Sequence, residues 1–108
     1  MAKIKWHDNA IILLDYYIGY ASSEYGKSTA KRWKTEIAAF EKRVMVFPES
    51  YTPEELLKDK SIMYRRRHLM NRRFKLIHYY DASEDTVHII DIWDTRMNPN
   101  TLVKRIKT

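Results

Sequence analysis

The spacing of apolar residues predicts a short strand followed by a helix at the start of the chain. Residues Lys3 to Trp6 alternate between polar and apolar side chains, which is the period of a strand. From Asp8, which we take as an N-cap, apolar residues recur every three or four positions and predict an amphipathic helix. Gly26 is expected to end this helix in a left-handed conformation. The predicted stripe of this helix comprises Ile11, Leu14, Ile18 and Ala21, widened by Tyr17 and Tyr20.

A second helical pattern follows after a short link, with Ser28 as its expected N-cap. Pro48 is expected to stop this helix. Two helices joined by so short a link predict an antiparallel hairpin whose stripes need a further surface to cover them. Thr52 to Glu55 then has the form of a capping box, which predicts one more turn of helix. The stripe of the second helix is Trp33, Ile37, Phe40, Val44 and Phe47.

The second half of the chain changes to the composition of strands. Three segments rich in β-branched and aromatic residues, at Ile62–Leu69, Arg73–Tyr80 and Thr86–Trp93, are separated by short turns and predict an antiparallel meander. The last segment is apolar on both faces, as in a central strand. The first strand is expected to join this sheet, and the helical hairpin to pack on one face. We therefore predict a single α+β domain of two layers over residues 1–108.

Composition limits the classes of function. The chain has 108 residues, a formal net charge of +6 and no cysteine, so it cannot form disulfides or bind a metal through thiolates. No segment resembles a signal peptide or approaches the roughly 20 apolar residues of a membrane span, so we expect a cytoplasmic protein without a membrane partner. The positive net charge indicates an acidic partner, although a basic surface that only contacts solvent would give the same net charge.

The densest chemical feature is a run of cations on the predicted hairpin. Arginine can bind phosphates or carboxylates through two hydrogen bonds at once, so the cluster is a candidate binding surface. The alternative is a set of solvated charges that protects a sheet edge. Because side chains alternate across a strand, Arg65 and Arg67 are expected on one face and Arg66 on the other. The candidate binding residues are Arg65, Arg66, Arg67, Arg73, Lys75 and, past the last strand, Arg96.

The remaining titratable residues do not predict a metal or cofactor site. His68, His78 and His88 fall on three successive strands, but the sequence leaves their register and faces open. No metal-binding motif, nucleophile elbow or glycine-rich phosphate loop is present, so we expect no metal and no cofactor. Asp91 and Asp94 have a spacing that suits ion pairs with arginines better than a catalytic carboxylate pair.

The motifs together resemble the RelE/ParE toxins of bacterial type II toxin–antitoxin modules, and most closely the ParE-like, plasmid-stabilisation branch. Each motif is weak alone, and the case depends on their order and spacing over nearly the whole chain. They are Ile4-Lys5-Trp6 with Ala10 and Leu14, the helix start Ser28-Thr29-Ala30, the stop Phe47-Pro48-Glu49, the strand from Arg73 to Tyr79, and the segment from Val87 to Pro99.

The resemblance implies two different activities within this group. RelE-like members cut messenger RNA on the ribosome, whereas characterised ParE-like members act on DNA gyrase. By position, the cations of the RelE-type site correspond to Arg65, Arg67, Lys75 and Arg96. Two departures from the RelE pattern stand out: arginine, a poor general base, replaces lysine at the first two positions, and the family tyrosine falls near Leu102.

We therefore expect a toxin that inhibits growth by binding DNA gyrase and that a cognate antitoxin neutralises in a hetero-oligomeric complex. One alternative is a ribosome-dependent mRNA endoribonuclease, in which Arg65, Arg67, Lys75 and Arg96 would be the catalytic candidates and His68 or His78 could supply acid–base chemistry. A second alternative is a degenerate binding module without toxicity. Whether the chain is an enzyme depends on which of these is correct.

Overall fold

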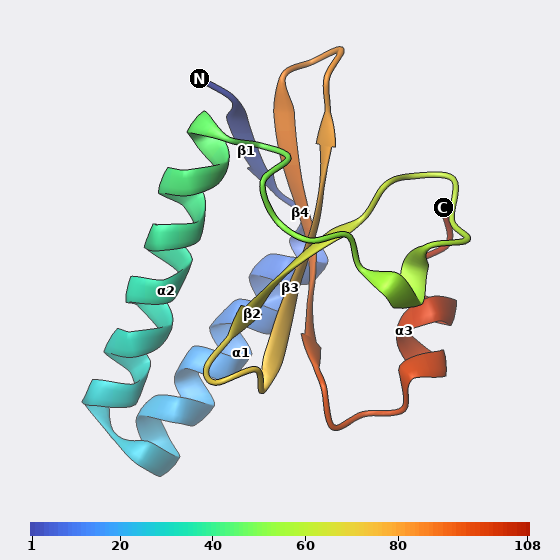
Figure 1. The fold of residues 1–108 in the computed structure, drawn as a ribbon. Helices are drawn as coiled ribbons and strands as arrows, with labels where there is room; N and C mark the ends of the chain where they lie inside the picture. The colour runs from blue at the N-terminus through green and yellow to red at the C-terminus, as the bar shows by residue number, and fades with distance from the viewer.

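The computed structural model describes all residues from 1 to 108, and its order of elements is the predicted one with an additional C-terminal helix (Figure 1). No helix in it is both long and apolar enough to cross a membrane. The elements are β1 (Lys3–Trp6), α1 (Asp8–Tyr25), α2 (Lys27–Val46), the 3-10 helix η1 (Glu55–Leu57), β2 (Arg65–Leu69), β3 (Phe74–Asp81), β4 (Thr86–Asp94) and α3 (Pro99–Arg105).

One four-stranded sheet in the order β1-β4-β3-β2 forms the centre of the molecule. The three C-terminal strands form the predicted antiparallel meander, and β1 joins it by pairing in parallel with β4, with Lys3 opposite Thr86. Strand β4 is therefore internal. Its residues are mostly buried on both faces, which explains why this segment is apolar throughout.

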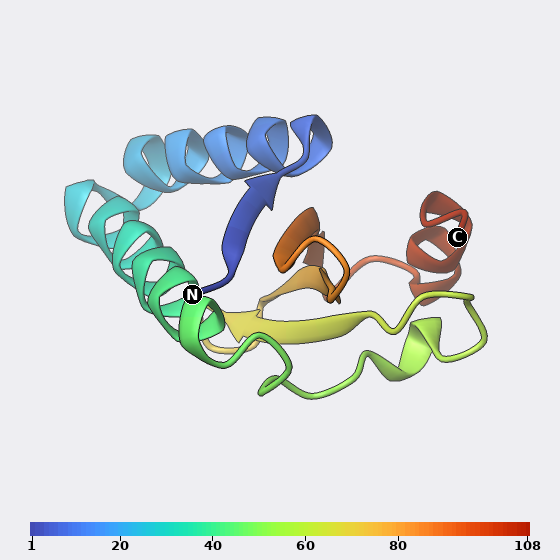
Figure 2. The same ribbon diagram turned by 90° about the horizontal axis from the view of Figure 1, so that it is seen from above.

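The α1–α2 hairpin covers one face of the sheet, which we call the helix face (Figure 2). Helix α2 turns its predicted stripe toward the strands, and Trp33, Phe40 and Val44 are almost completely buried there. The core between these layers also includes Leu76, Val87, Ile89 and Ile92 from the strands. Its apolar burial is the main source of stability for the fold. The predicted α+β architecture is confirmed.

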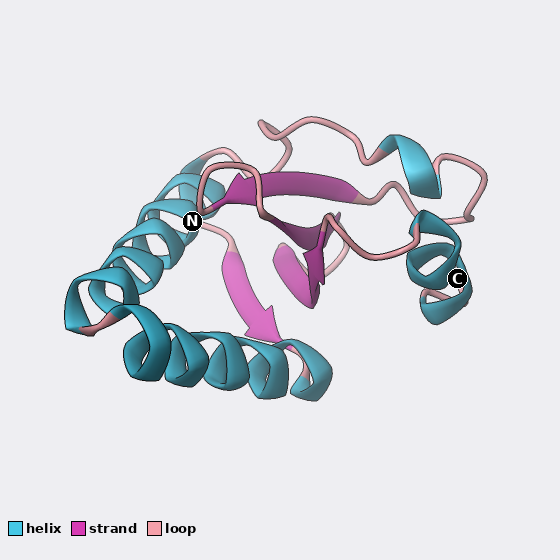
Figure 3. Cartoon of the chain, turned by 90° about the horizontal axis from the view of Figure 1, so that it is seen from below, coloured by secondary structure: helices cyan, strands magenta, loops and turns pink.

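The opposite face of the sheet, which we call the open face, is partly covered by α3 and η1 (Figure 3). A second, smaller apolar cluster there includes Leu57, Trp93 and Leu102, so the domain is not a simple two-layer structure. The sequence analysis missed α3, although it carries a recognisable start. Asn98 caps the helix by accepting a hydrogen bond of 3.0 Å from the Asn100 amide, and Pro99 occupies the first turn.

A β-bulge in β4 determines which face Asp91 occupies. The register shifts between the pairs Ile77–Asp91 and His78–Ile89, which leaves Ile90 without a partner on β3. Because of this extra residue, Asp91 points to the open face, where it is fully buried. The guanidinium of Arg105 in α3 donates to both carboxylate oxygens, with Nε 2.9 Å from Oδ2, and lies over the Trp93 ring. The bulge thus gives α3 an ionic attachment to the central strand.

Several predicted boundaries are wrong in detail. The N-cap of α1 is His7, and Asp8 lies in the first helical turn. The N-cap of α2 is Gly26 rather than Ser28, with φ 92° and ψ 177°, a region that is open to glycine but not the left-handed helical one expected. Phe47 lies beyond α2 and is exposed, and strand β2 begins only at Arg65.

The turn between β2 and β3 holds three consecutive residues, Met70, Asn71 and Arg72, at positive φ. This conformation is strained for residues with a side chain, so the surroundings must fix it. Helix α2 contributes Glu36, which accepts from the Met70 amide at 2.9 Å, and Arg32, which donates to the Asn71 side chain at 2.8 Å. The turn is therefore fastened to the helical hairpin.

Candidate functional site

The sheet divides the predicted cationic cluster between its two faces. Arg65 and Arg67 point to the helix face, where Arg65 donates to the Tyr51 carbonyl at 2.8 Å and Arg67 lies 3.6 Å from a Glu36 oxygen. Arg66, which alternates with them, points to the open face. The two arginines matched by position to the RelE-type cations therefore contact α2 and the loop before β2, and Arg65 also forms part of the surroundings of His78.

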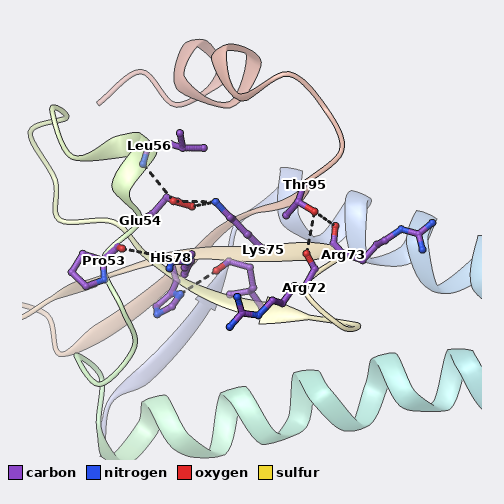
Figure 4. A network of polar contacts seen from close by, with 10 residues as sticks. Pro53, Glu54, Leu56, Arg72, Arg73, Lys75, His78 and Thr95 are labelled. Carbon is purple, nitrogen blue, oxygen red and sulfur yellow. Dashed lines mark hydrogen bonds and ion pairs between the residues drawn. The ribbon is translucent and has the colours of Figure 1, made fainter.

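A groove of about 660 Å³ on the open face contains Arg66, His68 and Lys75 beside η1 and α3. Figure 4 shows Lys75 and His78 leaving their strand on opposite sides, with Lys75 reaching Glu54. The Lys75 ammonium lies 2.5 Å from Glu54 Oε1 and 3.2 Å from Oε2. The Glu54 side chain is only 2% exposed, so this is a buried ion pair. The charge of Lys75 is already matched by a carboxylate within the protein.

The groove is electrically mixed rather than basic. Its cations Lys58, Arg66 and Lys75 face three carboxylates, those of Glu54, Glu55 and Asp59. The pKa of His68 is lowered by its partial burial and then by the nearby charges, chiefly Arg66. A neutral imidazole beside a lysine and a carboxylate could transfer protons.

A second hollow, of about 320 Å³, lies at the tip of the helical hairpin, and we call it the hairpin-tip hollow. It brings Arg73 and Arg96 together with Arg32 against a wall of aromatic rings. The Arg96 guanidinium donates to both oxygens of Asp94, at 3.2 and 3.0 Å, and these bonds lower the pKa of that carboxyl. The aromatic residues of the hollow are Tyr17, Tyr20, Tyr25, Trp33 and Phe74, of which Tyr17 and Trp33 stack 5.9 Å apart.

The four catalytic candidates thus do not form one site. Arg65 and Arg67 lie on the helix face, Lys75 on the open face and Arg96 at the hairpin-tip hollow. The sequence analysis also missed Glu54 as a member of the open-face groove. Its segment was interpreted only as a capping box, and its side chain does cap η1, accepting from the Leu56 amide at 3.4 Å.

The three strand histidines occupy separate environments. His78 is fully buried on the helix face between Phe40 and Tyr51, and burial lowers its pKa to about 4. Its Nδ1 lies 3.4 Å from the Leu76 carbonyl, and its Nε2 has no hydrogen-bond partner. His88 lies on the open face, stacked on Tyr79. These three histidines do not lie together as the ligands of one metal ion. Because His78 is fully buried, it is a core residue rather than an acid–base candidate.

Helix α1 leaves a second apolar stripe in contact with solvent. Its inner side buries Ala10 and Ala21, while Leu14 and Ile18 are only partly covered. On the outer side Ile12 is 67% exposed. The tyrosines of this side continue to the hairpin-tip hollow, and Tyr16 stacks on Tyr20 with ring centres 6.4 Å apart. We call this outer stripe, made of Ile12, Tyr16 and Tyr20, the α1 stripe.

Comparison with known proteins identifies the fold. Neither a protein-family model nor a curated protein sequence matches the chain. A solved structure described as the chromosomal ParDE toxin–antitoxin system from P. aeruginosa is similar over 87% of this chain and 96% of the matched chain. Its TM-score is 0.65 and its sequence identity 17%. This chain therefore has a ParE-like fold, as the order and spacing of its sequence motifs predicted.

Proposed function

We propose that the chain is the toxin of a type II toxin–antitoxin module and inhibits growth by binding DNA gyrase in the cytoplasm. The observation that carries this proposal is the hairpin-tip hollow. It presents Arg73 and Arg96 beside the exposed rings of Tyr20 and Tyr25. Tyrosine and arginine are enriched among the residues that dominate protein–protein binding energies. The hollow therefore has the composition of a binding site for a protein.

The open-face groove supports a binding role less well. Lys75 would have to leave Glu54 before it could stabilise a phosphate, and the three carboxylates of the groove repel an RNA backbone. The two carboxylates near the hairpin-tip hollow, Asp94 and Glu36, pair with Arg96 and Arg32, whose side chains are 63% and 48% exposed. These solvated pairs cost less to exchange for contacts with a partner than the buried pair of Lys75 and Glu54. The mixed charge of the groove thus favours a toxin that binds a protein over one that cleaves RNA.

The neutralising antitoxin is proposed to cover the α1 stripe. Ile12, Tyr16 and Tyr20 form an apolar line that a complementary amphipathic helix or extended segment could cover. Exposed lysines Lys27, Lys31 and Lys34 follow on α2, and the chain carries a net charge of +6, which suits an acidic partner. The solved ParDE structure is described as a toxin–antitoxin system, and this supports an antitoxin partner here.

A ribosome-dependent endoribonuclease is the second candidate function, and one observation favours it. His68, Lys75 and Arg66 share the open face with Glu54, which gives the acid–base partners that the matched sequence positions lack. A neutral His68 could accept the 2′-hydroxyl proton, while Arg66 stabilises negative charge on the phosphate. This candidate does not use Arg65, Arg67 or Arg96.

Induced expression of the isolated chain in a bacterial host separates the two functions. We expect growth arrest with induction of the DNA-damage response and without new messenger RNA 5′ ends, because a gyrase-binding toxin leaves messages intact. DNA-damage reporters and genome-wide mapping of 5′ ends measure the two outcomes in the same culture. New ends at fixed codon positions, lost when translation is blocked, would replace the gyrase proposal with the endoribonuclease.

Charge-reversal variants locate the surface responsible. Arg96→Glu, at the hairpin-tip hollow, is expected to restore growth by abolishing target binding, since a hot-spot residue contributes about 2 kcal/mol or more. Arg66→Glu, in the open-face groove, is the matched control and should remain toxic. Immunoblots must show equal levels of both variants. The reverse pattern, with Arg66→Glu harmless and Arg96→Glu toxic, contradicts the assignment of the hollow.

The α1 stripe can be tested through rescue by the antitoxin, which we expect to be encoded by the neighbouring gene. Tyr16→Glu places a charge in the middle of the stripe, where Tyr16 is 63% exposed, so folding should be unaffected. The variant is expected to remain toxic but to escape neutralisation, because an acidic partner is repelled and its apolar contact is lost. Co-expression growth assays measure this, with Glu24→Gln, outside the stripe, as the control. If the antitoxin fully restores growth in cells that express Tyr16→Glu, it binds a surface other than the α1 stripe.

A further inference from the structure

Three side chains of the kinds that bind metal ions lie close together at the C-terminal end of β3, which is the end away from the hairpin-tip hollow. We propose that Asp81, Glu84 and His88 form a binding site for a divalent transition-metal ion such as Zn²⁺. One ligand atom from each of the three residues lies within 4.8 Å of the other two. Asp81 ends β3, Glu84 lies in the turn to β4, and His88 lies in β4. The register that pairs Asp81 with Thr86 brings the turn and both strands together.

His88 is held in the orientation that a metal ligand requires. The side chain is only 9% exposed, and its ring stacks on Tyr79 with centres 4.7 Å apart and planes 9° apart. Its Nδ1 lies 2.8 Å from Nε2 of His7. Its Nε2 has no hydrogen-bond partner in the structure. Metal-binding histidines are commonly oriented through their second ring nitrogen in this way.

The contact with His7 is compatible with the tautomer of His88 that a metal ligand needs. A neutral imidazole has one nitrogen that accepts a hydrogen bond, and Nε2 of His7 lies 2.8 Å from Nδ1 of His88. When Nδ1–H of His88 donates to Nε2 of His7, the lone pair of His88 is on its unpartnered Nε2. Two histidines and a tyrosine ring thus present one imidazole lone pair at the end of the sheet.

The two carboxylates lack any cation within the protein. Asp81 accepts hydrogen bonds from the Ser83 hydroxyl at 2.6 Å and from the Ser83 amide at 3.0 Å. The chain contains 20 lysines and arginines, yet none of the five ion pairs involves Asp81 or Glu84. Neighbouring carboxylates repel each other unless a proton or a cation lies between them. Two carboxylates without an ion-pair partner and the ring of His88 are therefore in the same place.

The ligand set selects the class of metal. One imidazole nitrogen and two carboxylates suit Zn²⁺ or a similar first-row ion, with water completing the coordination. Magnesium and calcium prefer sites made of oxygen ligands alone. The ion would join the β3–β4 turn to the central strand. This site lies at the opposite end of β3 from the hairpin-tip hollow, so its existence is independent of the proposed function.

Calorimetric titration of the untagged, chelator-treated chain with Zn²⁺ alone tests the site. We expect one ion per chain and a higher melting temperature with Zn²⁺, because the folded state binds the ion more tightly. Glu84→Gln keeps the shape of an exposed side chain and should weaken binding at least tenfold, as should Asp81→Asn. Asp85→Asn is the matched control in the same turn and should bind as the native chain does, since asparagine tolerates its positive φ.

Titration with Co²⁺ provides a readout of the nitrogen ligand that does not depend on stability. The visible spectrum of bound Co²⁺ depends on its ligands, so an imidazole nitrogen gives an absorption different from that of a site made of oxygen ligands alone. His88→Gln should lose this spectrum. Absence of Zn²⁺ binding at submillimolar concentrations, or equal binding by the native chain, Glu84→Gln and Asp81→Asn, overturns the proposal.

Discussion

Lys75→Met is expected to lower the free energy of unfolding by about 3 kcal/mol, although the residue replaced is charged and polar. The methionine removes the only cation that pairs with Glu54, whose side chain is 2% exposed. A carboxylate left in such a place keeps the cost of its desolvation without the compensating attraction. Urea unfolding followed by circular dichroism measures the loss as a lower midpoint.

The double variant with Glu54→Gln provides the control. Removing the second charge as well should recover much of the lost stability, because a buried pair contributes little beyond balancing its own desolvation. Equal midpoints for Lys75→Met and the native chain would show that Glu54 is hydrated in solution. The prediction also affects any functional assay, since a Lys75 variant that loses function must first be shown to fold.

Stability is expected to fall by about 3 kcal/mol as the pH is lowered through the range in which His78 titrates. The unfolded chain binds a proton at this histidine near its ordinary pKa of 6.5, whereas the buried side chain does so only at a pKa of about 4. Between these values the unfolded state binds more protons, so the contribution is complete above pH 6.5 and is lost toward pH 4. Each pH unit between the two pKa values is worth about 1.4 kcal/mol.

The physical cause is the position of His78 on the helix face. Burial is the main reason for its low pKa, and Arg65 on the adjacent strand adds to it, while the Leu76 carbonyl opposes it. His78→Leu keeps an apolar side chain against Phe40 and should flatten the pH dependence of the denaturation midpoint. Part of the slope should remain, because burial also lowers the pKa of His7 and His68. An unchanged slope in His78→Leu would show that these other histidines account for the effect.

The sequence predicted those features that depend on local periodicity. The alternation at Lys3 to Trp6 matches β1 to the residue, and the stripe from Trp33 to Val44 is the buried side of α2. The apolar character of the Val87–Trp93 segment correctly indicated a central strand. These predictions are correct because every strand or helix that packs against a core requires the same spacing of apolar residues.

The candidate binding surfaces could not be predicted because they depend on which face each strand turns to the helices. The sequence correctly separated Arg66 from Arg65 and Arg67, but it could not show that Arg66 is the one beside Lys75. Glu54 lies 21 positions before Lys75, and no local pattern connects the two. The bulge at Ile90, which moves Asp91 to the open face, is likewise invisible in the order of residues.

The parallel pairing of β1 with β4 has a consequence for the time at which the ParE-like fold can form during synthesis. Strand β1 finds its partner only after Thr86 to Ile89 have been made, so the sheet cannot close before the ribosome has translated this segment. Such distant pairing delays folding relative to helix formation. A nascent chain shorter than about 90 residues therefore lacks the closed four-stranded sheet. The hairpin-tip hollow, which includes Arg96, is complete only after that point in synthesis.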